Sequence, residues 1–274
     1  MRVLTVFAHP FERSNTSASG RCQTDTEVTT ATRAADVVMV ILSVVLGVGS
    51  VVMFAMLQSI RWVDMGWPDS FALPWDALLS LAFFVQHSGM VRRPVRAWLA
   101  AILPSRYQGA LYSVTSGIVL ALVVVLWQRS ETRLLALEGI PRWTAQSLSV
   151  LAVVAFVLAA RSLRRSFDPL GLRPIRAHLR GQRDSAPDFV VRGPYLWVRH
   201  PLYSCVLVLL WTNPDVTADQ LLLSVAWSAW IWGATMLEER DLVAEFGESY
   251  RAYQRQVPML VPWRGRVTLP QRQR

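Results

Sequence analysis

The chain has 274 residues, of which 53% are hydrophobic and only 17% are charged. A soluble domain usually carries about 25% charged residues, so this composition excludes an ordinary soluble domain and indicates a membrane protein. The net charge of +9 comes from 28 arginines without any lysine. These arginines lie in blocks between apolar runs, as membrane topology places them, and not in the pattern of a nucleic-acid-binding surface.

Six apolar runs follow a polar N-terminal stretch, residues 1–35, which is expected to form a mobile cytoplasmic arm. Two of the runs, residues 202–211 and 221–237, are short and separated by Asn213-Pro214, so they are predicted to form a tightly joined or re-entrant hairpin. The other four have about the length needed to cross a ~30 Å hydrocarbon core: residues 37–57, 73–90, 110–127 and 145–160. The sequence therefore predicts an all-α polytopic membrane protein with five to six membrane helices.

The distribution of arginine predicts the orientation of these helices. Nine arginines lie in the loop at residues 161–201, and seven lie after Leu237. If the N-terminus is cytoplasmic, alternating segments place 24 arginines inside and 4 outside. The positive-inside rule thus predicts cytoplasmic N- and C-termini.

Polar residues gather in the segment from Arg192 to Tyr203, RGPYLWVRHPLY. Pro201 suits the first turn of a helix and pushes the preceding residue towards an extended shape, which would hold Arg199 and His200 at the mouth of that helix. A helix N-terminus supplemented by arginine can bind a carboxylate or a phosphate. Taken singly, each residue could be an interfacial anchor at headgroup level, but so dense a cluster favours a binding site.

Glu238 and Glu239 end an apolar run of about seventeen residues. Carboxylates at that depth are costly and tend to face a cavity or a cationic partner. The alternative is that both reach water, because Arg240 and Asp241 follow at once. We interpret the two glutamates and the Arg192–Tyr203 segment as two halves of one site.

A further pattern follows the glutamates, because apolar and aromatic residues recur there at spacings of 4, 3 and 4. This spacing predicts one face of an amphipathic helix that ends before Pro258. The helix is expected to lie against the membrane or against the loop at residues 161–201. The residues of this face are Phe246, Tyr250, Tyr253 and Val257.

Several stretches resemble a known family. GPYLWVRHPLY, then Trp211, Pro214 and Thr217, then EERDLVAEFGESYRAYQRQVPMLVP (residues 238–262) resemble the C-terminal signature of the isoprenylcysteine carboxyl methyltransferase superfamily. Similarity to the bacterial methanethiol S-methyltransferases is found in FFVQHSGMVRRPVRAWLAAILP (residues 83–104), around Tyr112 and in FDPLGLRP (residues 167–174). The resemblance covers about residues 72–263 and leaves residues 1–35 outside.

This resemblance implies an integral-membrane methyltransferase that binds S-adenosylmethionine between its C-terminal helices and the cytoplasmic loop, without a Rossmann domain. A sulfonium cofactor carries a positive centre, an ammonium and a carboxylate, so its pocket needs acidic, basic and aromatic groups together. The residues at the implied cofactor-binding positions are Tyr195, Arg199, His200, Tyr203, Glu238 and Glu239. The two glutamates are also candidate catalytic residues.

The thiolate is the nucleophile when a thiol is methylated, so an alkyl thiol has to lose its proton in an aligned, dry site. His87 is a candidate base, and a hydrogen-bonded structural histidine is the alternative. No metal site is expected, since Cys22 and Cys205 suggest neither a metal cluster nor a disulfide framework.

The sequence departs from the family pattern at three positions. Ser204 and Cys205 stand where the superfamily usually has a small or apolar residue and then glycine, which affects the expected shape of the pocket. Gln220 stands where methanethiol methyltransferases tend to carry histidine. The methyl acceptor is therefore less firmly predicted than the reaction class.

Residues 36–263 are predicted to form one membrane methyltransferase domain, with its cofactor-binding part at residues 185–263 and a basic tail at residues 264–274. The expected reaction converts methanethiol to dimethyl sulfide in the bacterial inner membrane. A small thiol and the lipid bilayer are the expected partners, with no nucleic acid and no obligate protein partner. The alternatives are methylation of a larger lipophilic acceptor, such as a prenylcysteine-like carboxylate or a lipid amine, and a non-catalytic membrane protein on the same scaffold.

Overall fold

The structure, a computed structural model, describes residues 30–57, 60–162, 168–182 and 191–267. The helices are α1 (Thr30–Ala55), α2 (Asp69–Met90), α3 (Arg93–Ile102), α4 (Ser105–Leu126), α5 (Gly139–Ser162), α6 (Arg173–Leu179), α7 (Pro201–Trp211), α8 (Ala218–Phe246) and α9 (Glu248–Gln256). A 3-10 turn, η1 (Gly193–Leu196), and two strands, β1 (Arg133–Ala136) and β2 (Asp215–Thr217), complete the described elements. Most of the predicted arm and the last seven residues of the predicted tail lie outside the described residues.

The six predicted membrane segments correspond to α1, α2, α4, α5, α7 and α8. Four of these helices are long and apolar enough to cross a membrane, namely α1, α4, α5 and α8, and α7 is a shorter apolar helix of 11 residues. α2 has 22 residues and is therefore about 33 Å long. Large apolar side chains are exposed along α1 and α5, as expected for surfaces that face lipid. The protein is thus an integral membrane protein with an all-α bundle, which confirms the predicted fold class.

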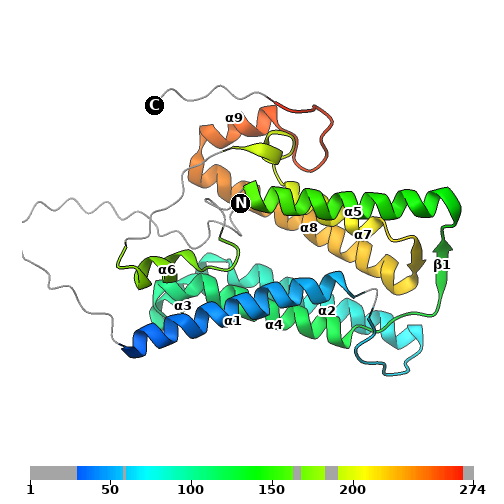
Figure 1. The fold of residues 1–274 in the computed structure, drawn as a ribbon, viewed down its shortest axis with the longest axis horizontal. Coiled ribbons are helices and arrows are strands. Elements are labelled where there is room, and N and C mark those ends of the chain that lie inside the picture. The colour runs from blue at the N-terminus through cyan, green and yellow to red at the C-terminus, as the bar shows by residue number, and fades with distance from the viewer. Residues whose placement is uncertain (1–29, 58–59, 163–167, 183–190, 268–274) are drawn as a thin grey trace, which may run out of the picture.

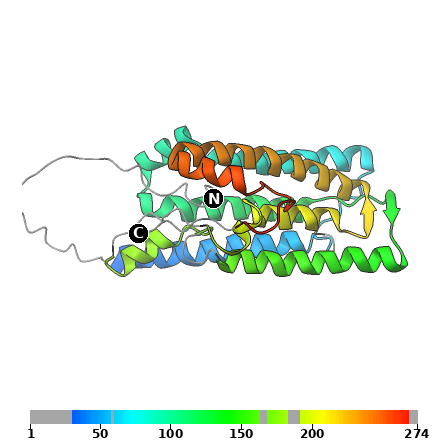
Figure 2. The same ribbon diagram turned by 90° about the horizontal axis from the view of Figure 1, so that it is seen from above.

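The helices form two layers, with α1, α2 and α4 in one and α5, α7 and α8 in the other (Figure 1). Around the bundle, α1 packs on α4, α4 on α2, α2 on α8, α8 on α7 and α7 on α5. This series is open between its first and last members, because α1 and α5 do not pack extensively on each other in the described structure. Viewed from above, α1 and α5 lie along one side of the molecule and α2 and α8 along the other (Figure 2).

The two ends of the bundle differ. The short helices α3, α6 and α9 lie near one end, and β1 lies at the other (Figure 1). There β1 pairs antiparallel with β2, with Arg133 opposite Thr217 and Ala136 opposite Asp215. This pairing ties the segment before α5 to the α7–α8 connection. The end that holds α3, α6 and α9 corresponds to the side predicted to be cytoplasmic.

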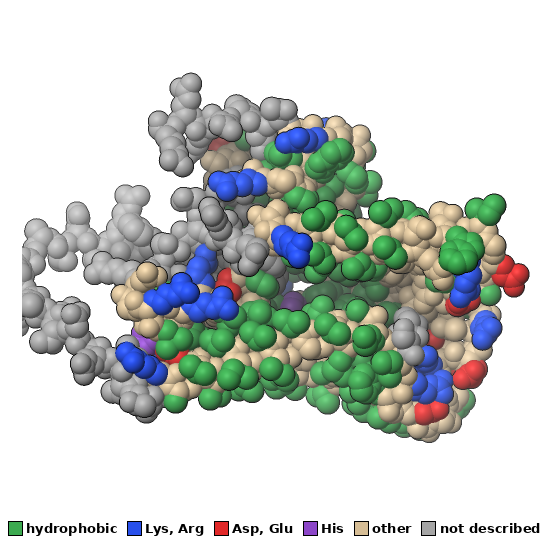
Figure 3. Space-filling model, in the orientation of Figure 1, with side chains coloured by type: hydrophobic (Ala, Val, Ile, Leu, Met, Phe, Trp, Pro, Cys, Tyr) green, Lys and Arg blue, Asp and Glu red, His purple; other side chains and the backbone are tan. Residues whose placement is uncertain are grey.

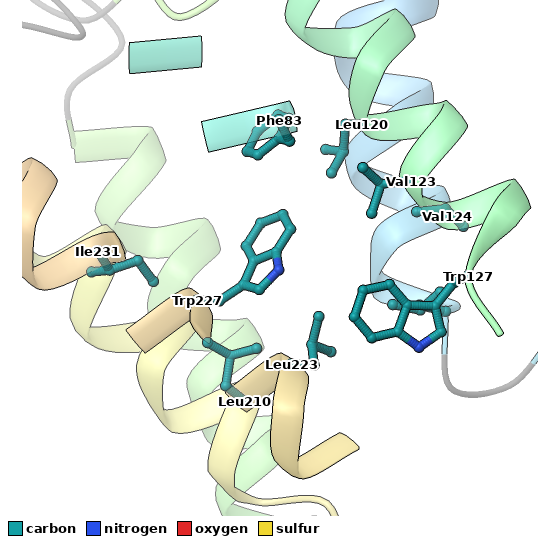
Figure 4. Packing of buried hydrophobic residues seen from close by; sticks show 10 residues of the cluster. Phe83, Leu120, Val123, Val124, Trp127, Leu210, Leu223, Trp227 and Ile231 are labelled. Atoms are coloured by element: carbon teal, nitrogen blue, oxygen red, sulfur yellow. The ribbon is translucent and has the colours of Figure 1, made fainter. Parts of the chain in front are cut away.

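Trp227 of α8 occupies the centre of the main hydrophobic core (Figure 4). Its ring stacks on Phe83 of α2 at a centroid distance of 5.2 Å, and Leu120, Val123 and Leu210 surround it from α4 and α7. Inside a bilayer, such side chains hold helices together by close van der Waals packing, because lipid is as apolar as the core itself. The core therefore holds α2, α4, α7 and α8 together on the closed side of the bundle.

The structure differs from the sequence prediction mainly at α8. The apolar run was predicted to end at residue 237, but the helix continues to Phe246, so Glu238 and Glu239 lie inside it. Gly247, at φ 54°, then separates α8 from α9. This positive φ favours glycine, because other residues pay a steric cost there. Likewise, α1 begins at Thr30, before the predicted start of the membrane domain at residue 36.

Candidate functional site

The structure brings the two polar segments of the sequence together. Arg199 donates from Nε to Glu239 Oε1 at 2.6 Å and from Nη2 to Oε2 at 2.9 Å, which is a two-pronged ion pair. Gln254 of α9 donates to Oε2 of the same carboxylate at 2.8 Å. The side chains of Arg199 and Glu239 are each only 10% exposed. A charge-assisted pair of this kind fixes both side chains in a defined geometry.

The segment that follows α9 holds this pair in place. The backbone amide of Arg199 donates to the carbonyl of Pro258 at 2.8 Å, and that of His200 donates to the carbonyl of Met259 at 3.1 Å. Ser204 donates from Oγ to the carbonyl of Leu260 at 2.7 Å. The start of α7 is therefore bound along one side by residues that lie almost sixty positions later in the chain.

The amphipathic helix predicted before Pro258 corresponds only in part to α9, because Phe246 ends α8, Gly247 separates the two helices and Val257 follows α9. Tyr250, Tyr253 and Val257 pack against Leu242 of α8. The Tyr253 hydroxyl donates to the carbonyl of Tyr195 at 2.6 Å, so the helix also packs on the described end of the loop at residues 161–201. Burial raises the pKa of both tyrosines on α9 well above that of an exposed phenol. The helix thus helps to hold Tyr195 and the Arg199–Glu239 pair in place.

Glu238 lies close to two further predicted site residues, Tyr203 and His200. Tyr203 donates from its hydroxyl to Glu238 Oε2 at 3.1 Å, and its ring lies nearly parallel to that of His200. His200 places Nε2 3.1 Å from Glu239 Oε1 and Nδ1 3.9 Å from Glu238 Oε2. Burial lowers the pKa of His200 to about 4, so the imidazole is neutral at pH 7.

A cavity of about 490 Å³ lies beside this network. Four of the six predicted cofactor-binding residues line it, and so does the candidate base His87; these lining residues are His87, Tyr195, Arg199, His200 and Tyr203. Glu238 and Glu239 are not among the lining residues and stand behind Tyr203 and Arg199 through the hydrogen bonds above. Figure 3 shows a hollow between α1 and α5, with a histidine side chain visible inside it.

The edge of the cavity near α6 is formed by the described part of the FDPLGLRP motif. Asp168 accepts hydrogen bonds from the amides of Leu172 and Arg173 and so caps the start of α6. Gly171 has φ 63°, and a Cβ there would stand 2.1 Å from the carbonyl carbon of Gly109. This close approach holds Gly171 against α4, while Leu170, which lines the cavity, accepts a hydrogen bond from Ser43 of α1 at 2.6 Å.

On the opposite wall, His87 of α2 faces two residues of α4. His87 Nε2 lies 2.7 Å from the Tyr112 hydroxyl, and Nδ1 lies 3.2 Å from Ser116 Oγ. Tyr112 and Ser116 also line the cavity, and neither was singled out as a site residue from the sequence. Their spacing of four places them on one face of a helix. This spacing is the sequence pattern from which the two residues could have been recognised together.

The three departures from the family pattern have different surroundings. Ser204 binds the backbone as described above, and Cys205 is not among the residues that line the cavity. Gln220 donates from Nε2 to the carbonyl of Leu210 at 3.1 Å. It lies eighteen residues before Glu238 in the same helix, a separation of about 27 Å. Gln220 is therefore far from Glu238, and it is not among the residues that line the cavity.

The cavity suits a ligand that is largely apolar and has one charged end. Its volume falls in the range of ~300–1,000 Å³ that small-molecule sites occupy. Apolar residues of α1 and α5, including Val51 and Phe156, form much of its lining, and Arg199 and His200 mark one polar side. Aromatic rings at Tyr195 and Tyr203 could pack on a cation or on a planar base. The lining thus supplies the basic and aromatic groups expected for S-adenosylmethionine, while the acidic pair, Glu238 and Glu239, lies outside the lining.

Comparison with known proteins places this chain among named relatives. Methanethiol S-methyltransferase 2 of Bradyrhizobium diazoefficiens is 36% identical over 203 residues, which cover 73% of this chain and 78% of that protein. Methanethiol S-methyltransferase of Pseudomonas sp. (strain GM41(2012)) is 36% identical over 203 residues, covering 73% and 76%. Nurim of Rattus norvegicus is 30% identical over 184 residues, covering 62% and 68%. No solved structure matches significantly.

The resemblance to methanethiol S-methyltransferases that the motifs indicated is thus confirmed. A family model described as NnrU protein matches residues 77–262. The matched region begins before His87 and ends after the Pro258–Leu260 segment, so it includes most of the residues described at the cavity. The chain therefore belongs to the NnrU protein family.

Proposed function

We propose that this protein is a membrane methyltransferase that uses S-adenosylmethionine to convert methanethiol to dimethyl sulfide. The observation that supports this proposal best is the cavity, which has predicted cofactor-binding residues on one wall and His87 on the other. The curated relatives named methanethiol S-methyltransferase, at 36% identity, support the choice of acceptor.

The donor wall would be formed by Tyr195, Arg199, His200 and Tyr203. When bound, S-adenosylmethionine supplies a methyl group on a positively charged sulfur. Glu239 already holds Arg199 through two hydrogen bonds, and Glu238 holds the hydroxyl of Tyr203. We therefore propose that both glutamates act on the cofactor by orienting these neighbours. Because these side chains are held in place before the cofactor binds, less entropy is lost when the two reactants are aligned.

The acceptor would lie towards His87. Apolar residues of α1, α4 and α5 surround this part of the cavity and would exclude water. Exclusion of water favours attack by a thiolate, because the nucleophile is not stabilised by hydration. His87 lies within hydrogen-bonding distance of two hydroxyl groups and is placed to take part in removing the thiol proton.

The test expresses the chain in a host that lacks the activity, supplies methanethiol and measures dimethyl sulfide in the headspace. A parallel titration measures binding of S-adenosylmethionine to the purified protein. We expect both binding and product. A protein that binds the cofactor but forms no dimethyl sulfide would exclude methanethiol as the acceptor and leave a larger lipophilic acceptor. A folded protein that does not bind the cofactor would exclude the proposal and favour a non-catalytic role.

A further inference from the structure

A hydrogen-bonded series of three side chains crosses from α2 to α4 at the wall of the cavity. Tyr112 is 4% exposed, and its hydroxyl lies 2.7 Å from His87 Nε2. Ser116, one turn further along α4, lies 3.2 Å from His87 Nδ1. All three residues line the cavity. The series is therefore in a position to meet a bound acceptor.

Aromatic packing fixes the imidazole of His87 between these partners. The ring of Phe83 stacks on it at a centroid distance of 5.0 Å, and Trp230 meets it edge-on at 5.4 Å. Both neighbours belong to the core that joins α2 to α8. In this packing Nε2 lies 2.7 Å from the Tyr112 hydroxyl, and Nδ1 lies 3.2 Å from both Ser116 Oγ and that same hydroxyl.

The two hydroxyl groups can set the proton positions of the imidazole. A neutral imidazole has one N–H donor and one acceptor nitrogen. If Nδ1 donates to Ser116, Nε2 accepts the hydroxyl proton of Tyr112. In that arrangement the Tyr112 oxygen is an acceptor towards the cavity, and its own proton already points at a base.

We propose that Tyr112 accepts the proton of the bound thiol while its own hydroxyl proton passes to Nε2 of His87. Ser116 is a positioning residue that keeps the imidazole proton on Nδ1. This inference rests on the proposed function and names the residue that meets the acceptor.

The step balances in atoms and charge. The S–H bond breaks, its proton moves to the Tyr112 oxygen, and the Tyr112 O–H proton moves to Nε2. The electron pair stays on the thiol sulfur and forms the new S–C bond, while the pair of the old C–S bond returns to the donor. One positive charge thus leaves the donor and one appears on His87. A cavity with few polar groups favours such a transfer, because creating a new charge there would be costly.

Three of the four other titratable side chains that line the cavity are bound to the glutamates of α8, and the fourth is Tyr195. His200 places both nitrogens towards Glu238 and Glu239, Arg199 is bound to Glu239, and Tyr203 donates to Glu238. Tyr112 and Tyr203 line the same cavity. The proposed acceptor end therefore adjoins the donor wall, as direct transfer between two bound molecules requires.

The first test compares wild type with Tyr112→Phe, using ethanethiol and a more acidic aromatic thiol as acceptors. We expect the variant to lose about 100-fold in rate with ethanethiol, as is typical when proton transfer is removed. The remaining rate should rise about tenfold per pH unit, because the variant depends on thiolate formed in solution. With the aromatic thiol, the loss should be less than about tenfold, since that acceptor ionises without help.

His87→Asn should show the same dependence on acceptor and pH, and the double variant should be no slower than either single variant. Tyr107→Phe is the matched control, because Tyr107 is another buried tyrosine of α4 with a hydrogen-bonded hydroxyl, bound to Asp36, but it does not line the cavity. The control should keep the wild-type rate. An equal loss with both acceptors at every pH, or no loss in Tyr112→Phe, would overturn the proposal.

A second measurement needs no methyl donor. 4-Nitrothiophenol is coloured only as its thiolate, so its ionisation in the cavity can be followed by absorbance. The bound probe should ionise at a lower pH in wild type than in Tyr112→Phe or His87→Asn. Identical titrations would contradict the relay even if methyl transfer is observed. A wild type that ionises the probe but methylates no thiol would contradict the proposed function and leave the relay.

Discussion

Helix α8 carries buried carboxylates in its first turn and in its last third, and their surroundings differ. At one end, Glu238 and Glu239 are 5% and 7% exposed; at the other, Asp219 is 1% exposed. We name these the Glu end and the Asp end. About 29 Å of helix separates Asp219 from Glu238. Because burial is nearly equal at both ends, it cannot be what distinguishes a site from a structural contact.

The two ends differ in the residues that bind their carboxylates. At the Glu end, the carboxylates bind side chains that line the cavity, namely Arg199, His200 and Tyr203. At the Asp end, Asp219 accepts hydrogen bonds from the indole of Trp127 at 3.1 Å and the amide of Ser130 at 3.2 Å. Neither of these partners lines the cavity.

The Asp end therefore joins the α4–β1 connection to the start of α8, and the Glu end also shapes a space for a ligand. A carboxylate buried near the end of a membrane helix is only a starting hypothesis for function. Its partners decide whether that hypothesis holds.

Glu239→Ala is expected to have the largest effect. It would leave the guanidinium of Arg199 without its carboxylate in a mostly buried place, and breaking a buried pair in this way costs about 3–5 kcal/mol. The free energy of unfolding in detergent should fall by that amount, and methyl transfer should be lost. Chemical denaturation and dimethyl sulfide formation are the measurements.

The control for this variant is an exposed ion pair at the other end of the bundle. Arg142 binds Asp215 at 2.8 Å with side-chain exposures of 39% and 48%. Exposed pairs contribute little to stability, so Arg142→Ala should unfold like wild type. If both variants behaved alike, burial of the Arg199–Glu239 pair would not matter for stability.

The sequence predicted the Glu end better than the Asp end. Dense polar residues at Arg199–Tyr203 and at Glu238–Glu239 stand out against apolar runs, so both halves of the Glu end could be recognised. Asp219 lies two residues before a long apolar run and looks like an ordinary helix-start residue. Its contact with Trp127 joins positions 92 residues apart, which no local pattern shows.

The helices were predictable because each needs an apolar surface of defined length. The walls of the cavity were not, because an apolar run does not reveal which helix it will pack against. Tyr112 and Ser116 lie inside such a run, and only the packing of α2 on α4 places them opposite His87. The extension of α8 past Glu239 was missed for a related reason, since polar residues after an apolar run can continue a helix as it leaves the membrane.

Asp219→Ala tests the Asp end and should have an intermediate effect. The change leaves the indole of Trp127 and the amide of Ser130 without their acceptor, and each unsatisfied buried donor costs about 1–3 kcal/mol. Stability should fall, but the folded fraction should bind S-adenosylmethionine as wild type does. Calorimetric titration of the folded protein measures this, and weakened cofactor binding in a stable Asp219→Ala protein would break the distinction between the two ends.

The smallest expected effect is that of Tyr203→Phe, which removes one hydroxyl from the Glu end. The lost hydrogen bond to Glu238 is worth about 1 kcal/mol in stability. Since Tyr203 also lines the cavity, we expect cofactor affinity to weaken by about fivefold, which corresponds to a similar free energy. Tyr107→Phe loses the same type of bond, to Asp36, away from the cavity, so it should lose stability alone. Dissociation constants for S-adenosylmethionine should therefore differ between the two variants. Equal affinities would mean that the Tyr203 hydroxyl does not help to shape the donor wall.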